Sequence, residues 1–239
     1  LDYLVKNYDS SIYAIKRFIG RDYNDPKVQE DIKGQNFPFK LVGDPKTKNP
    51  IVEVVKNNEK MQFSLEEISS FVIRKLVDSA EKFLNKRVDK LVITVPANFD
   101  NAQRNCTKQA AILADIEVLR IINEPTAAAL AYGLQDKEKT SNGKILVFDL
   151  GGGTFDVTIL SINKQSEENF EIISTNGNKF LGGEDFDNKL VDYFLDNFCS
   201  NTNEKKEEIL KDKKVIKNLK ISCENIKKIL STHTKTTLN

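Results

Sequence analysis

The clearest structural signal in this chain is the stretch Phe148-Asp149-Leu150-Gly151-Gly152-Gly153-Thr154-Phe155-Asp156. Its three consecutive glycines separate two β-branched runs, Lys144–Leu150 and Thr154–Ile162, which predict an antiparallel hairpin. Glycine loses more conformational entropy on folding than any other residue, so three in one turn are costly. Without side chains, however, the turn lets a ligand lie against backbone N–H groups, which suit an anion. The stretch therefore predicts a hairpin whose turn binds phosphate.

Polar side chains flank this glycine turn. Thr154 adds a hydroxyl group, and Asp149 and Asp156 stand on either side at a spacing suited to a hydrated Mg²⁺ ion. No G-x-x-x-x-G-K-[ST] phosphate loop occurs in the chain. The alternative is a plain hairpin with a flexible tip and two solvated aspartates.

On the N-terminal side of the hairpin, strand and helix patterns alternate. The expected elements are a strand at Leu91–Val95 buried on both faces, a helix over about 101–114 capped by Asp100 and Gln103, a strand at Val118–Ile122, and an Ala-rich helix from Pro125 to near Gly133. This alternation predicts an α/β fold with parallel strands.

The remaining segments are less regular. They predict a hairpin of Ile51–Val55 with Met61–Phe63, a helix begun by the capping box of Ser64 and Glu67, a linker at Asp136–Gly143, a strand at Phe170–Thr175, and helices over about 185–198 and 212–231. In the last helix, Leu219, Cys223, Ile226 and Leu230 form an apolar stripe. Residues 1–64 are otherwise turn-rich.

Composition excludes several classes of protein. Lys and Arg number 36 against 35 Asp and Glu, so a net charge of +1 gives no bulk attraction to nucleic acid or membranes. The three cysteines form no C-x-x-C pair, which favours free thiols and a cytoplasmic location. His233 is the single histidine, which disfavours a Cys/His zinc site and a histidine-based nucleophile. Because the chain begins at Leu1 and its single methionine is Met61, we expect a fragment of a longer protein.

A family resemblance joins these observations. The glycine stretch resembles the second phosphate loop of the superfamily that contains actin, hexokinase and the seventy-kilodalton heat-shock chaperones. Four further segments resemble chaperone motifs in the chaperone order: Ala14-Ile15-Lys16-Arg17-Phe18-Ile19-Gly20, Val95-Pro96-Ala97-Asn98-Phe99, Ile122-Asn123-Glu124-Pro125-Thr126-Ala127-Ala128-Ala129 and Leu181-Gly182-Gly183-Glu184-Asp185-Phe186-Asp187. The resemblance implies an α/β, actin-like (ribonuclease H-like) ATPase fold of two lobes, incomplete in this chain.

The resemblance also implies how the chain divides. Residues 1–64 would form the upper lobe of the first half, and residues 65–137 would form its core. Residues 138–181 would begin the core of the second half, and residues 182–239 would begin its upper lobe.

Roles for single residues follow from the same motifs. The resemblance implies catalytic roles for Lys16, Glu124, Asp149, Thr154 and Asp156, a metal site at Asp149, Asp156 and Glu124, nucleotide contacts at Gly151, Gly152, Gly153, Thr154, Gly182, Gly183, Glu184, Glu224, Lys227, Lys228 and Ser231, and an allosteric role for Pro96 and Arg104. In the family, the lysine matched by Lys16 reaches the terminal phosphate and orients the attacking water.

Read without the resemblance, these residues have ordinary explanations. Lys16 would be a solvated lysine, Glu124 a favourable charge at a helix N-terminus, and Pro96 the end of a strand. Glu224 and Lys228 would form an i,i+4 surface pair.

The sequence departs from the family pattern at a few positions. Lys228 stands where an arginine usually stacks on adenine, and a guanidinium stacks better than an ammonium group. Asn98 stands where an aromatic residue is common, and Ala111 and Asp115 stand where glycines are common.

The function implied is that of a chaperone ATPase. The parent protein would bind ATP and ADP and hydrolyse ATP with Mg²⁺, helped by K⁺, to control its affinity for unfolded polypeptides. Its partners would be a J-domain co-chaperone and a nucleotide exchange factor, with no nucleic acid and no membrane. One alternative is a weakly hydrolysing chaperone cousin that acts as an exchange factor or holdase. Another is a sugar kinase on the same fold. The alternative to a cytoplasmic location is the endoplasmic reticulum or an organelle.

Overall fold

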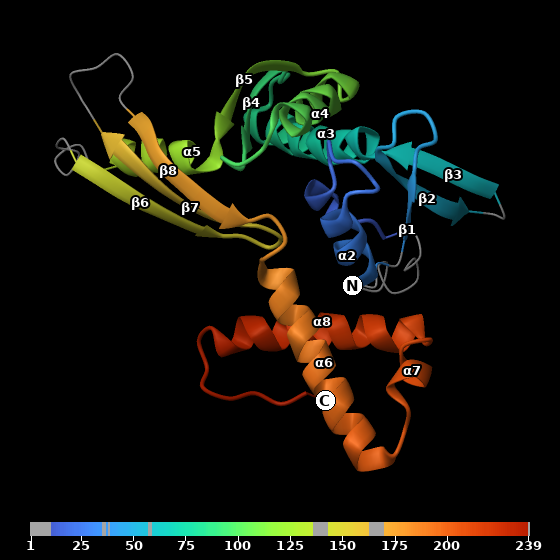
Figure 1. The fold of residues 1–239 in the computed structure, drawn as a ribbon. Coiled ribbons are helices and arrows are strands. Elements are labelled where there is room, and N and C mark those ends of the chain that lie inside the picture. The colour runs from blue at the N-terminus through green and yellow to red at the C-terminus, as the bar shows by residue number, and fades with distance from the viewer. Residues whose placement is uncertain are drawn as a thin grey trace.

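The computed structural model describes residues 11–34, 37, 39–56, 59–135, 143–162 and 170–238. Within these ranges the chain forms three separate sheets and the helices that join them (Figure 1). The strand orders are β1-β2-β3, β4-β5 and β6-β7-β8. The predicted mixed α/β class is therefore confirmed. The expected linker at 136–143 lies outside the described residues except for Gly143.

The N-terminal part combines short helices with an antiparallel sheet. It contains the 3₁₀ helix η2 (Ile15–Arg17), α2 (Pro26–Gly34), β1 (Lys40–Gly43), β2 (Pro50–Lys56) and β3 (Glu59–Ser64). The predicted hairpin of β2 and β3 is confirmed. Helix α2 and strand β1 were missed, although Asp25 accepts from the Lys27 N–H and Pro26 opens the helix. An acceptor followed by proline is a start signal that the sequence offered.

The long helix α3 (Leu65–Leu84) begins where the sequence predicts. The Glu67 N–H donates to Ser64 Oγ at 3.1 Å, and the Ser64 N–H donates to Glu67 Oε2 at 2.7 Å. Both hydrogen bonds of the predicted capping box are thus confirmed. Leu65 and Ile68 enter the largest core cluster, whose other fully buried members include Phe18, Val28 and Val52.

The parallel pair consists of β4 (Lys90–Val95) and β5 (Glu117–Asn123), joined by α4 (Asn101–Leu113) and followed by α5 (Glu124–Gln135). Parallel pairing and the cap of α4 by Asp100 are confirmed. Burial of these strands on both faces is wrong. Val92 is 50% exposed and Leu119 is 53% exposed, because no element of the described part covers their side chains.

The glycine hairpin forms as predicted. Strands β6 (Gly143–Leu150) and β7 (Phe155–Ile162) pair antiparallel, and β8 (Phe170–Asn178) adds to the other edge of β7. β8 runs three residues beyond the predicted strand. The register sets Asp149 directly opposite Asp156, so the two aspartates stand at the base of the glycine turn.

Two crossing helices follow the hairpin, α6 (Gly183–Thr202) and α8 (Lys213–Leu230), with the short α7 (Lys206–Ile209) between them (Figure 1). Val191 and Leu195 of α6 pack with Ile216 and Cys223 of α8. The predicted apolar stripe is confirmed at Cys223 and Ile226, which are buried, but Leu230 is 44% exposed. Among the described residues, no helix is long and apolar enough to cross a membrane.

Candidate active site

An ion pair joins two of the predicted catalytic residues. Lys16 lies in η2 and Glu124 opens α5, and Lys16 Nζ is 2.6 Å from Glu124 Oε1. The side chain of Lys16 remains 49% exposed and that of Glu124 is 19% exposed. The fold therefore brings together charges 108 residues apart in sequence, with the ammonium group still open to a ligand.

Asp156 is the most buried carboxylate of this group. Its exposed fraction is only 2%, and burial is the main cause that raises its pKa. The charges of Glu124 and Asp149 raise that pKa further, while Lys16 and Lys179 oppose the effect. Three of the predicted carboxylates thus share one electrostatic neighbourhood, and the negative charge on Asp156 is costly there.

The glycine turn is docked against the start of α6. The N–H of Gly183 donates to Gly151 O at 3.0 Å, and the N–H of Glu184 donates to Gly152 O at 2.9 Å. A Cβ atom on Gly182 would lie 2.5 Å from the backbone of Gly152 and Gly153. The two glycine motifs therefore form one backbone-to-backbone unit, whereas the resemblance implied only that each of them contacts the nucleotide.

One face of this unit is open. A Cβ atom on Gly152 would meet nothing within 4 Å, and one on Gly151 would meet only Thr154 O, at 3.4 Å. The N–H of Gly151 donates back to Thr154 O at 2.9 Å, which closes the turn. A ligand can therefore approach the turn at Gly152, as the absence of side chains predicts.

We expect Gly182→Ala to weaken ADP binding in the full-length protein that carries this chain. The added methyl group must displace the backbone of Gly152 and Gly153, and overpacking of this kind costs about 1–3 kcal/mol. Isothermal titration calorimetry measures the affinity. Gly34→Ala is the matched control, because a Cβ atom there meets nothing within 4 Å. Equal ADP affinities for both variants would contradict a role for this contact.

A buried arginine that the sequence analysis missed connects α6 to the N-terminal part. The side chain of Arg17 is 1% exposed, and its guanidinium group binds Asp31 at 3.0 Å and Asp185 at 2.8 Å, with Glu184 at 3.8 Å. Burial opposes its charge, but the hydrogen bond to Asp185 and the charge of Asp31 raise the pKa of Arg17 above its ordinary value. Its neighbour Glu184 has its pKa raised by burial, which Arg17 partly offsets.

The predicted adenosine face of α8 is divided. Glu224 and Lys228 form an i,i+4 pair at 2.6 Å, with side chains 46% and 63% exposed. Lys227 instead donates to Gly183 O at 2.9 Å and pairs with Asp187 at 2.7 Å. The ammonium group of Lys227 is therefore held at the glycine unit. Glu224 and Lys228 instead form the i,i+4 surface pair that is their ordinary explanation.

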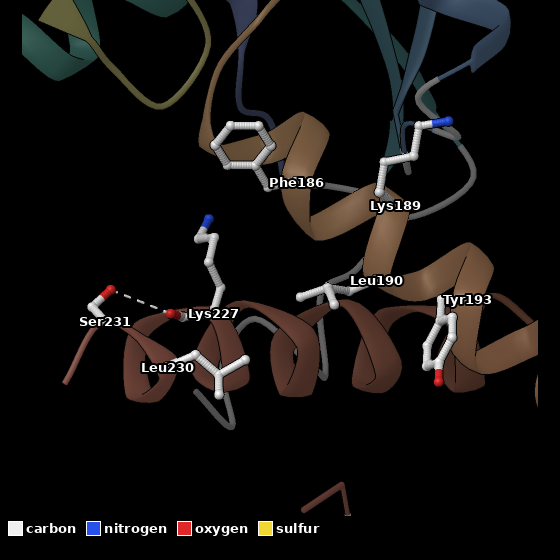
Figure 2. Close-up of a pocket in the computed structure, with 7 residues that line it drawn as sticks. All are labelled: Phe186, Lys189, Leu190, Tyr193, Lys227, Leu230 and Ser231. Atoms are coloured by element: carbon white, nitrogen blue, oxygen red, sulfur yellow. Dashed lines mark hydrogen bonds between the residues drawn. The ribbon is translucent and has the colours of Figure 1, made fainter. Parts of the chain in front are cut away.

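A groove lies between α6 and α8, and Figure 2 shows its walls. Its volume is about 520 Å³, and it is lined by Phe186, Lys189, Leu190, Tyr193, Lys227, Leu230 and Ser231. Lys227 and Ser231 belong to both the groove and the predicted adenosine set, and Glu224 and Lys228 do not line it. In Figure 2 the Lys227 side chain extends from α8 toward the end of α6 that carries Phe186.

The two predicted allosteric residues lie at one turn. Strand β4 ends at Val95, and Pro96 is fully buried at the start of the turn. Arg104 donates from Nε to Phe99 O at 3.1 Å and from Nη2 to Asn123 Oδ1 at 2.7 Å. Arg104 is thus an anchor of the turn between β4 and α4.

The acidic groups fit a hydrated cation. Among the described residues, no three His, Cys, Asp or Glu side chains gather closely enough to hold a metal ion directly. Asp156 is nevertheless buried beside the charges of Glu124 and Asp149, so a cation would relieve their repulsion. Mg²⁺ commonly keeps several water molecules, which carboxylates can hold without contacting the ion.

Comparisons with known proteins agree on one family. The family model described as Hsp70 protein matches residues 2–239. The chain is 44% identical over 232 residues to heat shock 70 kDa protein 2 of Paracoccidioides lutzii, covering 97% of this chain and 34% of that protein. It is 44% identical over 223 residues to heat shock cognate 70 kDa protein 3 of Dictyostelium discoideum, covering 93% of this chain and 34% of that protein. The chain thus spans about a third of the length of these relatives.

Proposed function

The chain belongs to the Hsp70 family, with its actin-like ATPase fold, and we propose that it is part of the nucleotide-binding domain of an ATP-driven chaperone. The observation that carries the proposal is the ion pair of Lys16 with Glu124 beside the buried Asp156. In this proposal residues 1–64 and 65–137 are the upper lobe and core of the first half. Residues 138–181 and 182–239 begin the same parts of the second half.

The glycine unit would bind the phosphates of ATP or ADP. Its open face at Gly152 offers backbone N–H groups, and Thr154 adds a hydroxyl group at the end of the turn. Gly182, Gly183 and Glu184 support this turn through the start of α6. The groove between α6 and α8 would take the adenosine part, because Lys227, which lines it, also binds the glycine unit through Gly183 O.

Hydrolysis would rest on charges rather than on covalent chemistry. Lys16 would stabilise the negative charge that spreads over the transferring phosphoryl group, because its side chain carries a positive charge and is 49% exposed. Glu124 holds that ammonium group, and with Asp156 it would orient the attacking water. Asp149, Asp156 and Glu124 would hold the water molecules of a Mg²⁺ ion, which when bound neutralises phosphate charge, with K⁺ as a second cation.

The adenosine contact makes a separate prediction. If residue 228 stacks on the adenine base, we expect Lys228→Arg to tighten binding of ADP by roughly 0.5–1 kcal/mol, because a planar guanidinium stacks on a base better than an ammonium group does. Glu224 and Ser231 complete the proposed adenosine set. Titration calorimetry on the full-length protein compares the two versions. Equal affinities would leave Lys228 in its surface pair with Glu224, away from the base.

The wider function is proposed from family membership. Nucleotide state would set the affinity of the whole protein for unfolded polypeptide, with a J-domain co-chaperone and an exchange factor as partners in the cytoplasm. Pro96 and Arg104 would transmit that state, since their turn lies between β4 and α4. The sugar-kinase alternative does not agree with membership in the Hsp70 family.

The experiment is the release of a fluorescent peptide from the full-length protein when ATP is added. Faster release with ATP than with ADP is expected. Tight binding of ATP with no change in release and no hydrolysis would instead favour the weakly hydrolysing cousin. Absence of ATP binding would overturn the proposal.

A further inference from the structure

Asn98 makes a contact with Asp156 that no motif predicted. Asn98 lies in the turn between β4 and α4, and its Nδ2 donates to Asp156 Oδ1 at 3.0 Å. The two residues are 58 positions apart, and Asp156 belongs to β7, in another sheet from the strand β4 that precedes Asn98. Within the described residues, the Asn98 side chain thus donates a hydrogen bond to Asp156, the most buried carboxylate of the candidate site.

The other amide atom of Asn98 has no such contact. Among the described residues, its Oδ1 is buried and has no hydrogen-bond partner. Buried polar atoms are nearly always hydrogen-bonded, to the protein or to ordered water. An orphan acceptor beside Asp156 therefore requires a donor from outside the described chain, and a water molecule supplies two.

Hydrogen bonds hold the backbone of the turn that carries Asn98. Arg104 holds the turn through Phe99 O and Ala97 O, and the Phe99 N–H donates to Pro96 O at 3.1 Å. A Cβ atom on Gly177 would lie 2.8 Å from Asp156 Oδ1. Glycine at that position therefore leaves room for the oxygen that Asn98 binds.

We propose that Asn98 is a positioning residue for hydrolysis. Its Nδ2 holds the Asp156 carboxylate in one orientation, and its Oδ1 accepts a hydrogen bond from a water molecule held between the two side chains. The role differs from that of an aromatic residue at this position, which has no amide pair to offer. This inference rests on the proposed ATPase function, since it assigns the amide to that reaction.

Two substitutions at one position separate positioning from packing. Asn98→Asp keeps the shape but removes the donor, and Asn98→Leu removes both polar atoms. In the full-length protein we expect single-turnover ATP hydrolysis to fall by about 10-fold or more in both variants, as for other groups that orient reactive-site ligands. Affinity for ADP without Mg²⁺ should stay within about two-fold. A residue that acts only on the chemical step lowers the rate of hydrolysis without changing the affinity for product.

The matched control is Asn105→Leu, at an exposed position of α4. It should leave hydrolysis unchanged. A wild-type rate in Asn98→Asp would mean that only shape matters and would overturn the proposal. Parallel loss of ADP affinity and thermal stability in Asn98→Leu would also overturn it, because a merely structural residue behaves in that way.

A spectroscopic readout does not depend on hydrolysis. With ¹⁵N-labelled asparagine, the Asn98 side-chain amide signal of nucleotide-free protein should shift in Asp156→Ala and stay unchanged in Lys33→Ala, an exposed site on α2. An unchanged signal in Asp156→Ala would overturn the contact itself. If wild-type protein fails to hydrolyse ATP, the proposed function fails and the positioning role falls with it. If wild-type protein hydrolyses ATP normally and the Asn98 variants do so at the same rate, the positioning role of Asn98 is wrong and the proposed ATPase function stands.

Discussion

Lys16→Ala in the full-length protein should lower the rate of single-turnover ATP hydrolysis by about 100-fold or more. Loss of one charge aimed at a transferring group typically costs about 3 kcal/mol of transition-state stabilisation. Affinity for ADP should remain within a few-fold, because ADP lacks the terminal phosphate and the glycine unit is untouched. Quenched-flow measurement of ADP formation, with calorimetry in parallel, checks both expectations.

The control for this result is Lys33→Ala, which removes an exposed lysine on α2. It should hydrolyse ATP at the wild-type rate. If Lys16→Ala also keeps the wild-type rate, Lys16 has no place in the reaction. Its ion pair with Glu124 would then be a contact between η2 and α5 without catalytic consequence.

Arg17→Met should lower the free energy of unfolding by about 3–5 kcal/mol, the usual cost of removing one partner from a buried ion pair. The guanidinium group binds both Asp31 and Asp185 from a side chain that is 1% exposed. Methionine fills much of the same volume, so the loss comes mainly from carboxylates that lose their counter-charge. Because Asp185 also supports the start of α6, weaker ADP binding should accompany the loss.

Urea denaturation followed by circular dichroism gives the free energy of unfolding of the wild-type protein and of Arg17→Met. Arg74→Met is the matched control, because Arg74 pairs with Asp78 and Glu81 on the exposed side of α3 and should leave the unfolding midpoint unchanged. Equal midpoints for Arg17→Met and wild type would contradict the buried network. A loss confined to ADP affinity, with normal stability, would show that Arg17 acts at the ligand instead.

The sequence predicted the elements whose boundaries are set by interactions between residues close together in the chain. The capping box at Ser64 and the glycine turn after Leu150 each fix a boundary within a few residues, and both are found. Strand β1 was missed because four residues carry too little pattern to reveal a period. The exposure of Val92 and Leu119 could not be predicted, because the apolar character of a side chain does not determine whether another element packs against it.

The candidate site divides in the same way. The pairing of Lys16 with Glu124 spans 108 residues, so it followed from the family resemblance and not from spacing. Arg17 was missed because an arginine beside a lysine has the pattern of a solvated pair. Its burial depends on Asp31 and Asp185, which only the tertiary fold brings to it.

Asn98 shows a third case. The sequence marked it as a departure from the family pattern but gave no sign that it contacts Asp156. Neither residue type nor distance along the chain distinguishes a surface amide from one that binds a buried carboxylate. The contact exists because β7 and the turn after β4 meet in space.

The most direct test of the proposed ATPase function is single-turnover hydrolysis of ATP by the full-length wild-type protein, with Mg²⁺ and with EDTA. We expect bound ATP to be converted to ADP and phosphate when Mg²⁺ is present and to stay intact in EDTA. ATP that binds in Mg²⁺ and is later released unchanged would contradict the assignment of Lys16, Glu124 and Asp156 to hydrolysis.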